Sequence, residues 1–441
     1  MPLRICYGLS VEPVPTLIPT RRLKKGGWYL ARAYPHFDYP WSFEQAAAYV
    51  TDSDAIRRHS FLPLLSFTQK RRRYSTRDDE PVVKAKLREL AIPGHGDGYI
   101  FAWYAQQLSI RYEALLRAEE LHHCVLAYRP SIGTNISFAR EAFADIASRP
   151  ACLAIALDLK NFFPTISHAT LKRNWAEVAG TKGLRADHFK VFRAITNYAE
   201  VSLDACYKRL GIDQAQSVPR PLCSPARFRA EIRDAGLISV NRKDHGIPQG
   251  AQISALLSNI YMLTFDRAIR AAVEVVGGSY RRYSDDLLLV LPENFDLNEA
   301  VRAVNAELAS LGGSTKLNED KTEVARFKRD AAGRLQADRD LQYLGFVFDG
   351  EQALVRSSTL SKYSRRLVYA TRGAKRMAEQ TGTPIFKRSI YRKFTHLGTA
   401  NFVSRYCQEA DDALGNGAIR RQMRRHMRRT LALLKPRGPT P

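Results

Sequence analysis

The stretch Ser279-Tyr-Arg-Arg-Tyr-Ser-Asp-Asp-Leu-Leu-Leu-Val290 decides the fold of this 441-residue chain. Its apolar part, Leu287 to Val290, does not alternate with polar residues, which predicts a strand buried on both faces. Asp285 and Asp286 would stand at the mouth of that strand, where two charges are costly unless a cation lies beside them. Hard oxygen ligands suit Mg²⁺, so the pair predicts a divalent-metal site. The alternative is a surface hairpin with acidic turn residues, and a third carboxylate elsewhere would decide against it.

Charge and length narrow the class of protein. Lys plus Arg number 68 and Asp plus Glu 44, a net charge of +24. A chain this basic usually meets a polyanion, with nucleic acid as the first candidate and a solvated basic surface as the alternative. The length predicts about three structural units. The cysteines lack Cys-x-x-Cys spacing, which favours reduced thiols over zinc or disulfides. Neither a secretory h-region nor a membrane-spanning run is present, so we expect a soluble cytoplasmic protein that does not bind membranes.

A third carboxylate follows another continuous apolar run. Ala151 to Leu157 predicts a buried strand that ends in Asp158. Between the two strands, Gly246-Ile-Pro-Gln-Gly250 opens a helix, and backbone N–H groups at a helix start suit an incoming anion. Lys321 is a candidate cation for phosphate. These groups are what two-metal phosphoryl transfer needs, because carboxylates fix the ions that serve the attacking hydroxyl and the leaving pyrophosphate.

The order of these motifs resembles the palm of a reverse transcriptase, over roughly residues 83 to 350. Motif A is matched by Leu157-Asp158-Leu-Lys-Asn-Phe-Phe163, motif B by Gly246-Ile-Pro-Gln-Gly250, and the Tyr-x-Asp-Asp box by Tyr283-Ser-Asp-Asp286. Motif D is matched by Leu317-Asn-Glu-Asp-Lys321, the primer grip by Leu344-Gly-Phe346, and two fingers motifs by Arg88-Glu-Leu-Ala-Ile-Pro93 and Val125-Leu-Ala-Tyr-Arg-Pro130.

The resemblance implies a role for each matching residue. Asp158 and Asp285 would hold two Mg²⁺ ions, with Asp286 in support and Mn²⁺ as an alternative ion. Phe163 would stack under the sugar and exclude a 2′-OH, which favours dNTPs, whereas its neighbour Phe162 is expected in the core. Gln249 and Gly250 would line the nucleotide pocket, and Lys86 and Arg88 would bind the triphosphate. Lys321 would donate a proton to pyrophosphate. Nucleic acid would contact Tyr283, Leu344 and Gly345.

The implied fold is α+β: a right-hand polymerase with fingers, an antiparallel palm sheet, a helical thumb and an N-terminal extension. The expected boundaries are 1–82 for the extension, 83–157 for the fingers, 158–350 for the palm with an insertion at about 168–245, and 351–441 for the thumb. In the last segment, Ile419, Met423, Met427 and Leu431 form an apolar helical stripe. Arginines flank it and would face a polyanion unless the helix is merely solvated; the candidates are Arg420, Arg424 and Arg428.

The N-terminal sequence resembles that of bacterial defence-associated reverse transcriptases of the "unknown group" type. Its matching segments are Tyr34-Pro-His-Phe-Asp38, His59-Ser-Phe-Leu-Pro63 and Arg71-Arg-Arg-Tyr74. They look most like the first enzyme of type three antiviral systems, which pair two reverse transcriptases with a non-coding RNA. This resemblance implies an RNA template, a DNA product and a second reverse transcriptase subunit as partners. The alternatives are a retron enzyme making branched RNA–DNA, a related RNA polymerase, and a non-catalytic RNA-binding palm.

Gly94-His-Gly-Asp-Gly98 breaks the pattern that precedes it. We expect a loop turn in which His95 is satisfied by hydrogen bonds. The alternative is a metal or nuclease site that uses His95 and Asp97.

Overall fold

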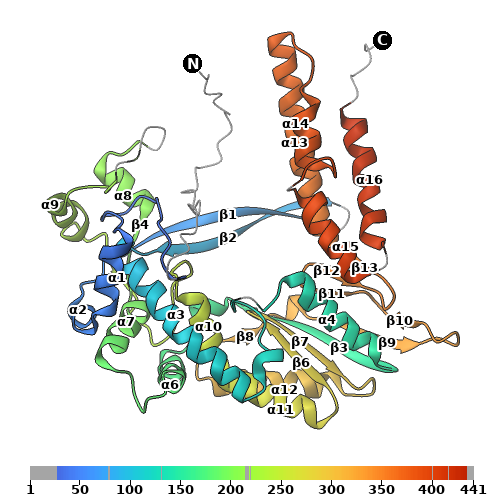
Figure 1. Ribbon diagram of the computed structural model, residues 1–441, viewed down its shortest axis with the longest axis horizontal. Coiled ribbons are helices and arrows are strands. Elements are labelled where there is room, and N and C mark those ends of the chain that lie inside the picture. Colours follow the sequence, from blue (N-terminus) through green and yellow to red (C-terminus); the bar gives the residue numbers. More distant parts are fainter. Residues whose placement is uncertain are drawn as a thin grey trace. The chain divides into compact units, whose positions relative to one another are not determined.

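The computed structural model describes residues 27–77, 80–130, 132–213, 218, 220–399, 401–415 and 417–434; side chains at 71–86, 425, 427 and 431 lie outside this description. The chain forms two compact units, each built from several segments. Figure 1 labels the helices and strands of both units. Unit 1 comprises Met1–His122, Asn161–Arg267 and Ala306–Lys316. Unit 2 comprises His123–Lys160, Ala268–Asn305 and Leu317–Pro441.

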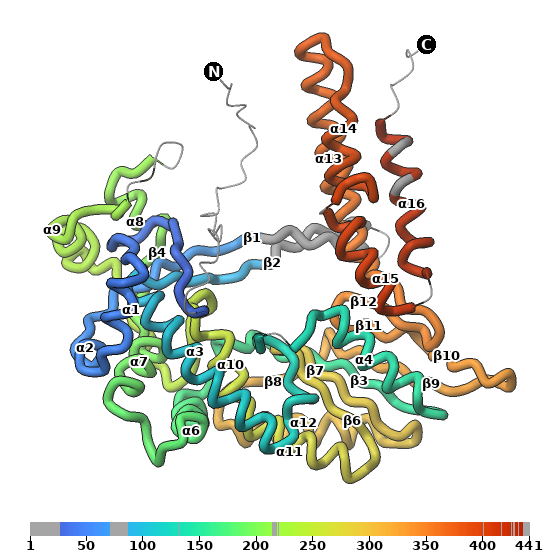
Figure 2. The backbone as a smooth tube through the Cα atoms, in the orientation of Figure 1, coloured from blue at the N-terminus to red at the C-terminus, as the bar shows by residue number. Residues whose placement is uncertain are grey.

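Unit 1 contains a four-stranded sheet in the order β2-β1-β4-β5. Its strands are β1 (Leu64–Arg77), β2 (Glu80–Ile92), β4 (Ala199–Ser202) and β5 (Ser239–Val240). β1 and β2 form a long antiparallel ribbon, whose path Figure 2 follows. Basic and apolar residues alternate from Val83 to Arg88, a pattern typical of a strand, and this segment lies in β2.

Unit 1 also contains helices, and the first of them, α1, has a capped start. Ser42 and Gln45 cap it reciprocally, which satisfies backbone donors at the helix start. The helices are α1 (Phe43–Thr51), α2 (Ser53–Arg58), α3 (His95–Ala118), α5 (Phe162–Thr165), α6 (His168–Val178), α7 (Ala186–Thr196), α8 (Leu203–Leu210), α9 (Pro225–Arg227), the π-helix Phe228–Arg233 and α10 (Ser254–Tyr261). α11 (Leu263–Val275) and α12 (Leu297–Ser310) each have residues in both units.

Two helix boundaries differ from the prediction, because side chains distant in sequence satisfy the backbone. The glycine-rich segment 94–98 is not a loop: the Asp38 carboxylate accepts the His95 and Gly96 N–H groups, both at 2.9 Å, and caps α3 there. The helix predicted to open at Gly246–Gly250 is divided into two helices, α10 and α11. The Asn174 amide donates to the carbonyls of Ile260 and Tyr261, both at 3.0 Å, at the end of α10, where the helical hydrogen-bond pattern is interrupted.

Unit 2 is built on an antiparallel sheet in the order β10-β9-β3-β7-β6, with β8 paired to β3. Its strands are β3 (Ala151–Lys160), β6 (Ser279–Tyr283), β7 (Asp286–Leu291), β8 (Lys316–Leu317), β9 (Glu323–Arg329) and β10 (Leu335–Ala337). Leu287 to Val290 are all buried, as predicted. α4 (Asn135–Ser148) shares one core with the alternate side chains of the sheet, such as Phe143 with Ala154 and Val290. The apolar runs thus become the central strands.

The primer-grip segment is a hairpin rather than one strand. β11 (Leu341–Tyr343) and β12 (Phe346–Phe348) meet at a turn in which Leu344 and Gly345 have φ of 45° and 93°. β13 (Ala353–Val355) completes this small sheet. The matched fingers motif at 125–130 contributes a single bridge, between Val125 and Arg282.

Helices complete unit 2: α13 (Ser357–Thr381), α14 (Lys387–Phe394), the π-helix Phe402–Cys407, α15 (Gln408–Leu414) and α16 (Ala418–Leu433). In α16, Ile419 and Met423 are buried and Arg424 and Arg428 are exposed, as the stripe predicts. The side chains of Met427 and Leu431 fall outside the described residues. Within the described chain, every helix is too short or too polar to cross a bilayer.

Candidate active site

Neighbouring strands bring the three predicted carboxylates together in unit 2. Asp158 on β3 stands directly opposite Asp286, the first residue of β7. Asp285 lies in the turn between β6 and β7, and its carbonyl accepts the Leu159 N–H at 3.0 Å. β3 continues two residues past Asp158, so this carboxylate lies inside the strand rather than at its end. The sequence predicted the residues, and the pairing of β3 with β7 brings them together.

The turn of the box is held in an uncommon backbone conformation. Ser284 has a φ of 62°, in the left-handed region that non-glycine residues rarely adopt. The buried Arg282 guanidinium donates to the Ser284 carbonyl at 3.2 Å. The Ser284 hydroxyl donates to the Tyr128 hydroxyl oxygen at 3.1 Å. The sequence motifs assigned no role to Arg282 or Tyr128, although Arg282 lies directly before the box and Tyr128 within a matched fingers motif.

Burial and neighbouring charges strongly perturb the pKa of Asp286. Burial, and then the charges of Asp285 and Asp158, raise the pKa of Asp286 to about 7. Lys321 and Arg356 act in the opposite direction. Arg356 was not singled out from the sequence, because it precedes α13 outside every matched motif. Crowded, partly buried carboxylates of this kind are the environment that a divalent cation relieves.

Lys321 forms an ion pair with one of these carboxylates. Its Nζ donates to Asp158 Oδ2, and the Asn318 amide donates to the same oxygen at 3.1 Å. As the side chains stand, no group of three or more His, Cys, Asp or Glu residues in the described ranges is arranged to hold a metal ion. The donor chemistry fits hard divalent ions, but Asp158 would have to exchange its lysine for the ion. The predicted contact of Lys321 with pyrophosphate remains a prediction.

The predicted nucleic-acid contacts of unit 2 lie on separate elements. Tyr283 ends β6, with its ring 6.1 Å from that of Phe138. The primer-grip turn is anchored by Asn135, whose amide donates to the Leu344 carbonyl at 3.1 Å and the Tyr406 hydroxyl at 2.9 Å. No sequence motif pointed to Asn135, because its partners are distant in sequence.

The three arginines of α16 that were predicted to contact a polyanion do not share one environment. Arg420 forms ion pairs with Asp411 at 3.2 Å and Asp412 at 3.5 Å. Arg424 and Arg428 are exposed. A solvated or nucleic-acid-facing role therefore fits Arg424 and Arg428 better than Arg420.

Unit 1 contains the predicted nucleotide residues. Phe162 is buried, as expected for a core residue, whereas Phe163 is only partly buried. The Phe163 carbonyl accepts the Ile247 N–H at 3.1 Å, which joins motif A to motif B. Gly246 has a φ of 90°, and its N–H donates to the Ile166 carbonyl at 2.8 Å. These bonds fix the start of the motif B loop beside Phe163.

The end of that loop packs against β2. The Gln249 carbonyl accepts the Ala91 N–H at 2.8 Å. Gly250 has a φ of 132°, and a Cβ there would lie 2.6 Å from the Ala91 carbonyl oxygen. Both the backbone conformation and the close approach therefore require glycine. Arg88 lies on β2 opposite Gln69, and the side chain of Lys86 lies outside the described residues.

His95 and Asp97 prove to be structural. His95 Nε2 lies 3.1 Å from the Tyr34 carbonyl oxygen. Asp97 pairs with His59 Nε2 at 2.7 Å and accepts the Leu62 N–H at 2.9 Å. The expected satisfied histidine is confirmed, although it lies in a helix rather than a loop.

Residues 113–348, more than half of the chain, match the family described as "Reverse transcriptase (RNA-dependent DNA polymerase)". The chain belongs to the reverse transcriptase family. This membership confirms the predicted enzyme class, an RNA-directed DNA polymerase and thus a nucleotidyltransferase, and the right-hand polymerase fold. Enzymes of this family generally use divalent metal ions. A comparison with curated proteins found no significant match to this reverse transcriptase.

Similar solved structures include telomerases at low identity. Apo telomerase from Candida tropicalis, truncated from the C-terminal domain, is 14% identical with a TM-score of 0.41, over 70% of this reverse transcriptase and 58% of that chain. Telomerase from Candida albicans, in complex with a fragment of telomeric RNA, is 13% identical with a TM-score of 0.38, over 71% and 49%. The reverse transcriptase thus spans only about half of these chains, and the family assignment rests on the sequence match alone.

Proposed function

We propose that the protein copies RNA into DNA by two-metal nucleotidyl transfer, with Asp158, Asp285 and Asp286 as the ligands of two Mg²⁺ ions. The observation that supports this most directly is the register that sets Asp158 against Asp286, with Asp285 in the adjoining turn. Bound divalent ions would supply activation of a primer 3′-hydroxyl and neutralisation of the leaving pyrophosphate, and Mn²⁺ could replace Mg²⁺.

Lys321 has two tasks in this proposal. Without ions it neutralises Asp158, which lowers the cost of a partly buried carboxylate. During the reaction it donates a proton to pyrophosphate. Lys321 belongs to the same unit as the three carboxylates, and it ends the short helix Glu319–Lys321 that follows β8.

The residues of unit 1 bind the incoming nucleotide. Phe163 is partly buried and so presents part of its ring outside the core, where it rejects a 2′-hydroxyl. Gln249 and Gly250 line the pocket, and Arg88 with Lys86 on β2 bind the triphosphate. The expected substrates are therefore dNTPs.

RNA template and DNA product contact unit 2 at Tyr283, at Leu344 and Gly345 of the primer-grip turn, and at Arg424 and Arg428, with Arg420 released from its acidic partners. The net charge of +24 supports a nucleic-acid partner. The N-terminal resemblance supports an antiviral role in the bacterial cytoplasm, with a non-coding RNA and a second reverse transcriptase subunit. A retron enzyme is the second candidate.

Primer extension tests the proposal. Purified protein is given an RNA template, a DNA primer, Mg²⁺ and either dNTPs or rNTPs. We expect extension with dNTPs, and a loss of at least roughly a hundredfold in Asp285→Ala/Asp286→Ala, because ligands of both ions are removed. Glu299→Gln, an exposed change on α12, is the matched control.

Each other outcome favours a different function. Equal extension by wild type and the double variant would refute catalysis at this box. RNA binding without any extension would favour a non-catalytic palm, and rNTP incorporation an RNA polymerase. Sequencing of co-purified nucleic acid separates the two biological roles, because branched RNA–DNA indicates a retron and long repetitive DNA a defence enzyme.

A further inference from the structure

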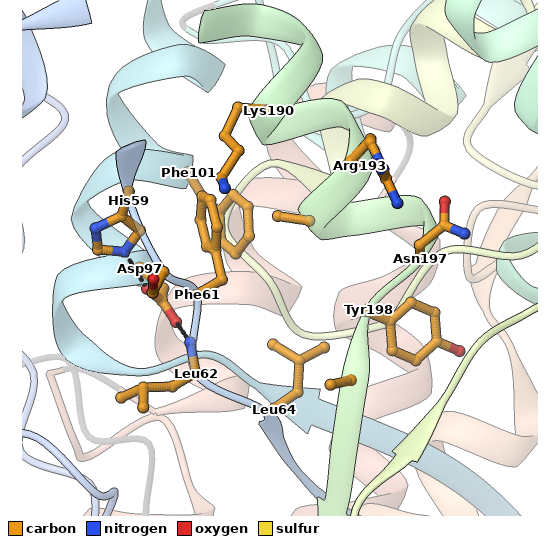
Figure 3. A pocket seen from close by; sticks show the side chains of 13 residues that line it. His59, Phe61, Leu62, Leu64, Asp97, Phe101, Lys190, Arg193, Asn197 and Tyr198 are labelled. Atoms are coloured by element: carbon orange, nitrogen blue, oxygen red, sulfur yellow. Dashed lines mark hydrogen bonds and ion pairs between the residues drawn. The ribbon is translucent and has the colours of Figure 1, made fainter. Parts of the chain in front are cut away.

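Unit 1 contains a pocket whose lining residues have no role in the proposed polymerase reaction. It lies between the segment that links α2 to β1, helix α3 and helix α7, and has a volume of about 260 Å³ (Figure 3). Its lining comes from the segment 59–64, from Asp97 and Phe101 of α3, and from the segment 190–199. These residues come from separate stretches of sequence, so only the fold brings them together.

A chain of hydrogen bonds fixes one wall of the pocket. The buried Asp97 carboxylate accepts the Leu62 N–H at 2.9 Å and pairs with His59 Nε2 at 2.7 Å. The Tyr49 hydroxyl lies 2.8 Å from His59 Nδ1, so both ring nitrogens of the histidine are engaged. The segment His59 to Leu62 is thereby held to α3, and the wall is preformed.

The pocket combines a flat aromatic and aliphatic surface with cations. Phe61 stacks on Phe101 with ring centroids 5.4 Å apart and 20° between the planes. Lys190 extends toward these rings, and Arg193, less than one helical turn along α7, lies across the pocket with Asn197 (Figure 3). Among the described lining residues the acidic one is Asp97, which His59 already pairs. The site therefore suits a planar, apolar ring attached to an anion.

The volume of the pocket limits the ligand to a single nucleobase. Pockets for drug-sized ligands measure about 300–1,000 Å³, so a volume of about 260 Å³ admits one base but not a stack of several. A base in a duplex is covered on both faces and cannot enter a pocket, whereas an unpaired base can. Aromatic rings beside basic side chains are the usual means by which proteins hold single strands.

The strand that lines the pocket leads directly into a basic stretch. Leu64 lines the pocket and begins β1, and Lys70-Arg-Arg-Arg73 follow on the same strand. At about 3.3 Å per residue, these positions are some 20–30 Å from Leu64 along the strand. A polyanion that follows β1 would thus reach the pocket, which favours a nucleic-acid strand over a free nucleotide.

We propose that this pocket receives one unpaired base of a single-stranded nucleic acid, whose adjoining phosphate binds Lys190 and Arg193. Phe61 supplies the stacking surface and Asn197 the polar group for a base edge. The site uses none of the carboxylates of unit 2 and needs neither dNTP nor divalent ion. Its occupant anchors the strand rather than reacting.

Fluorescence anisotropy tests the pocket without dNTPs and in EDTA. The probes are a labelled 12-nucleotide single-stranded RNA and the same strand with abasic residues. We expect Lys190→Ala/Arg193→Ala to weaken binding of the base-bearing strand by roughly tenfold, beyond the loss in Lys208→Ala/Arg209→Ala, a matched removal of two exposed charges from α8. Phe61→Ala should reduce the preference for the base-bearing over the abasic strand by roughly tenfold, as loss of one stacked base predicts.

Localisation and competition complete the test. RNA that carries 4-thiouridine should cross-link to peptides that contain residues 59–64 or 190–198, and the double variant at 190 and 193 should lose these cross-links. Equal binding by that variant and its matched control would overturn the proposal, as would equally tight binding of blunt duplex RNA. Competition by nucleoside monophosphates at the concentration of the RNA strand would assign the pocket to free nucleotides and likewise overturn it.

Discussion

Asp158 and Asp286 face each other across neighbouring strands of the palm sheet, one on β3 and one at the start of β7. Residues directly opposite in an antiparallel pair have Cβ atoms about 4.5–5.5 Å apart, and like charges there are destabilising. Burial and the neighbouring carboxylates accordingly raise the pKa of Asp286 to about 7. A divalent ion bound at this position would remove the repulsion between the carboxylates.

The first prediction follows from the sign of that shift. Without divalent ions the folded state holds the Asp286 proton more tightly than the unfolded state, whose carboxyl titrates near 3.9. The free energy of unfolding should therefore fall as pH rises from about 4 through about 7. Asp286→Asn removes the titration, so in EDTA the variant should be more stable than wild type at pH 8, by about 4 kcal/mol, and not at pH 4. Urea unfolding at the two pH values measures this.

The control for this titration is Asp320→Asn, an exposed change in the same short helix as Lys321. It should leave the pH dependence unchanged. Mg²⁺ should restore the stability of wild type at pH 8 and have little effect on Asp286→Asn. A pH dependence that persists in Asp286→Asn would assign the effect to another group.

The second prediction concerns Gly250. Alanine there would strain a φ of 132° and set its Cβ 2.6 Å from the Ala91 carbonyl oxygen. We expect Gly250→Ala to lower kcat/KM for dNTPs at least roughly tenfold and to cost about 1–3 kcal/mol of stability. Gly183→Ala, with nothing within 4 Å of its Cβ, should do neither. Steady-state primer extension with thermal unfolding distinguishes the two, and normal activity in Gly250→Ala would contradict the close packing of the loop against β2.

The third prediction separates two adjacent phenylalanines. Phe163→Ala should relax the rejection of ribonucleotides, because the partly buried ring is the proposed gate. Phe162→Ala should instead lower stability by about 3–5 kcal/mol, because Phe162 is buried in the core. The ratio of dNTP to rNTP incorporation measures the gate, and an unchanged ratio in Phe163→Ala would remove that assignment.

The fourth prediction tests the support of the box turn. Tyr128→Phe deletes the hydroxyl that accepts from Ser284, while the exposed ring remains. One hydrogen bond is worth about 0.5–1.5 kcal/mol, so activity should fall roughly two- to tenfold with little loss of stability. In a double-mutant cycle, Ser284→Ala should add nothing to Tyr128→Phe. Fully additive losses would show that the two hydroxyls act independently; Tyr39→Phe, another exposed tyrosine, is the control.

Local patterns in the sequence were sufficient for much of the fold and for the identity of the acidic residues. The unbroken apolar runs before Asp158 and after Asp286 have no polar face, and only central strands can bury both of their sides. The Ser42–Gln45 cap, the alternation in β2 and the stripe that includes Ile419 and Met423 likewise depend on neighbours within a few residues. Such features are readable without tertiary information because the groups that satisfy one another are close in the chain.

What the sequence determined by itself is the set of motifs, their order and the buried strands that carry them. Tertiary structure decided how the remaining polar groups are satisfied. Asp38 accepts the first N–H groups of α3, and Asn174 donates to carbonyls at the end of α10. Lys321 donates to Asp158, and the Tyr128 hydroxyl accepts from Ser284 in the turn of the box. Each of these partners lies tens to more than a hundred residues away. A buried polar group accepts whichever partner the fold brings within hydrogen-bonding distance, and no local period encodes that choice.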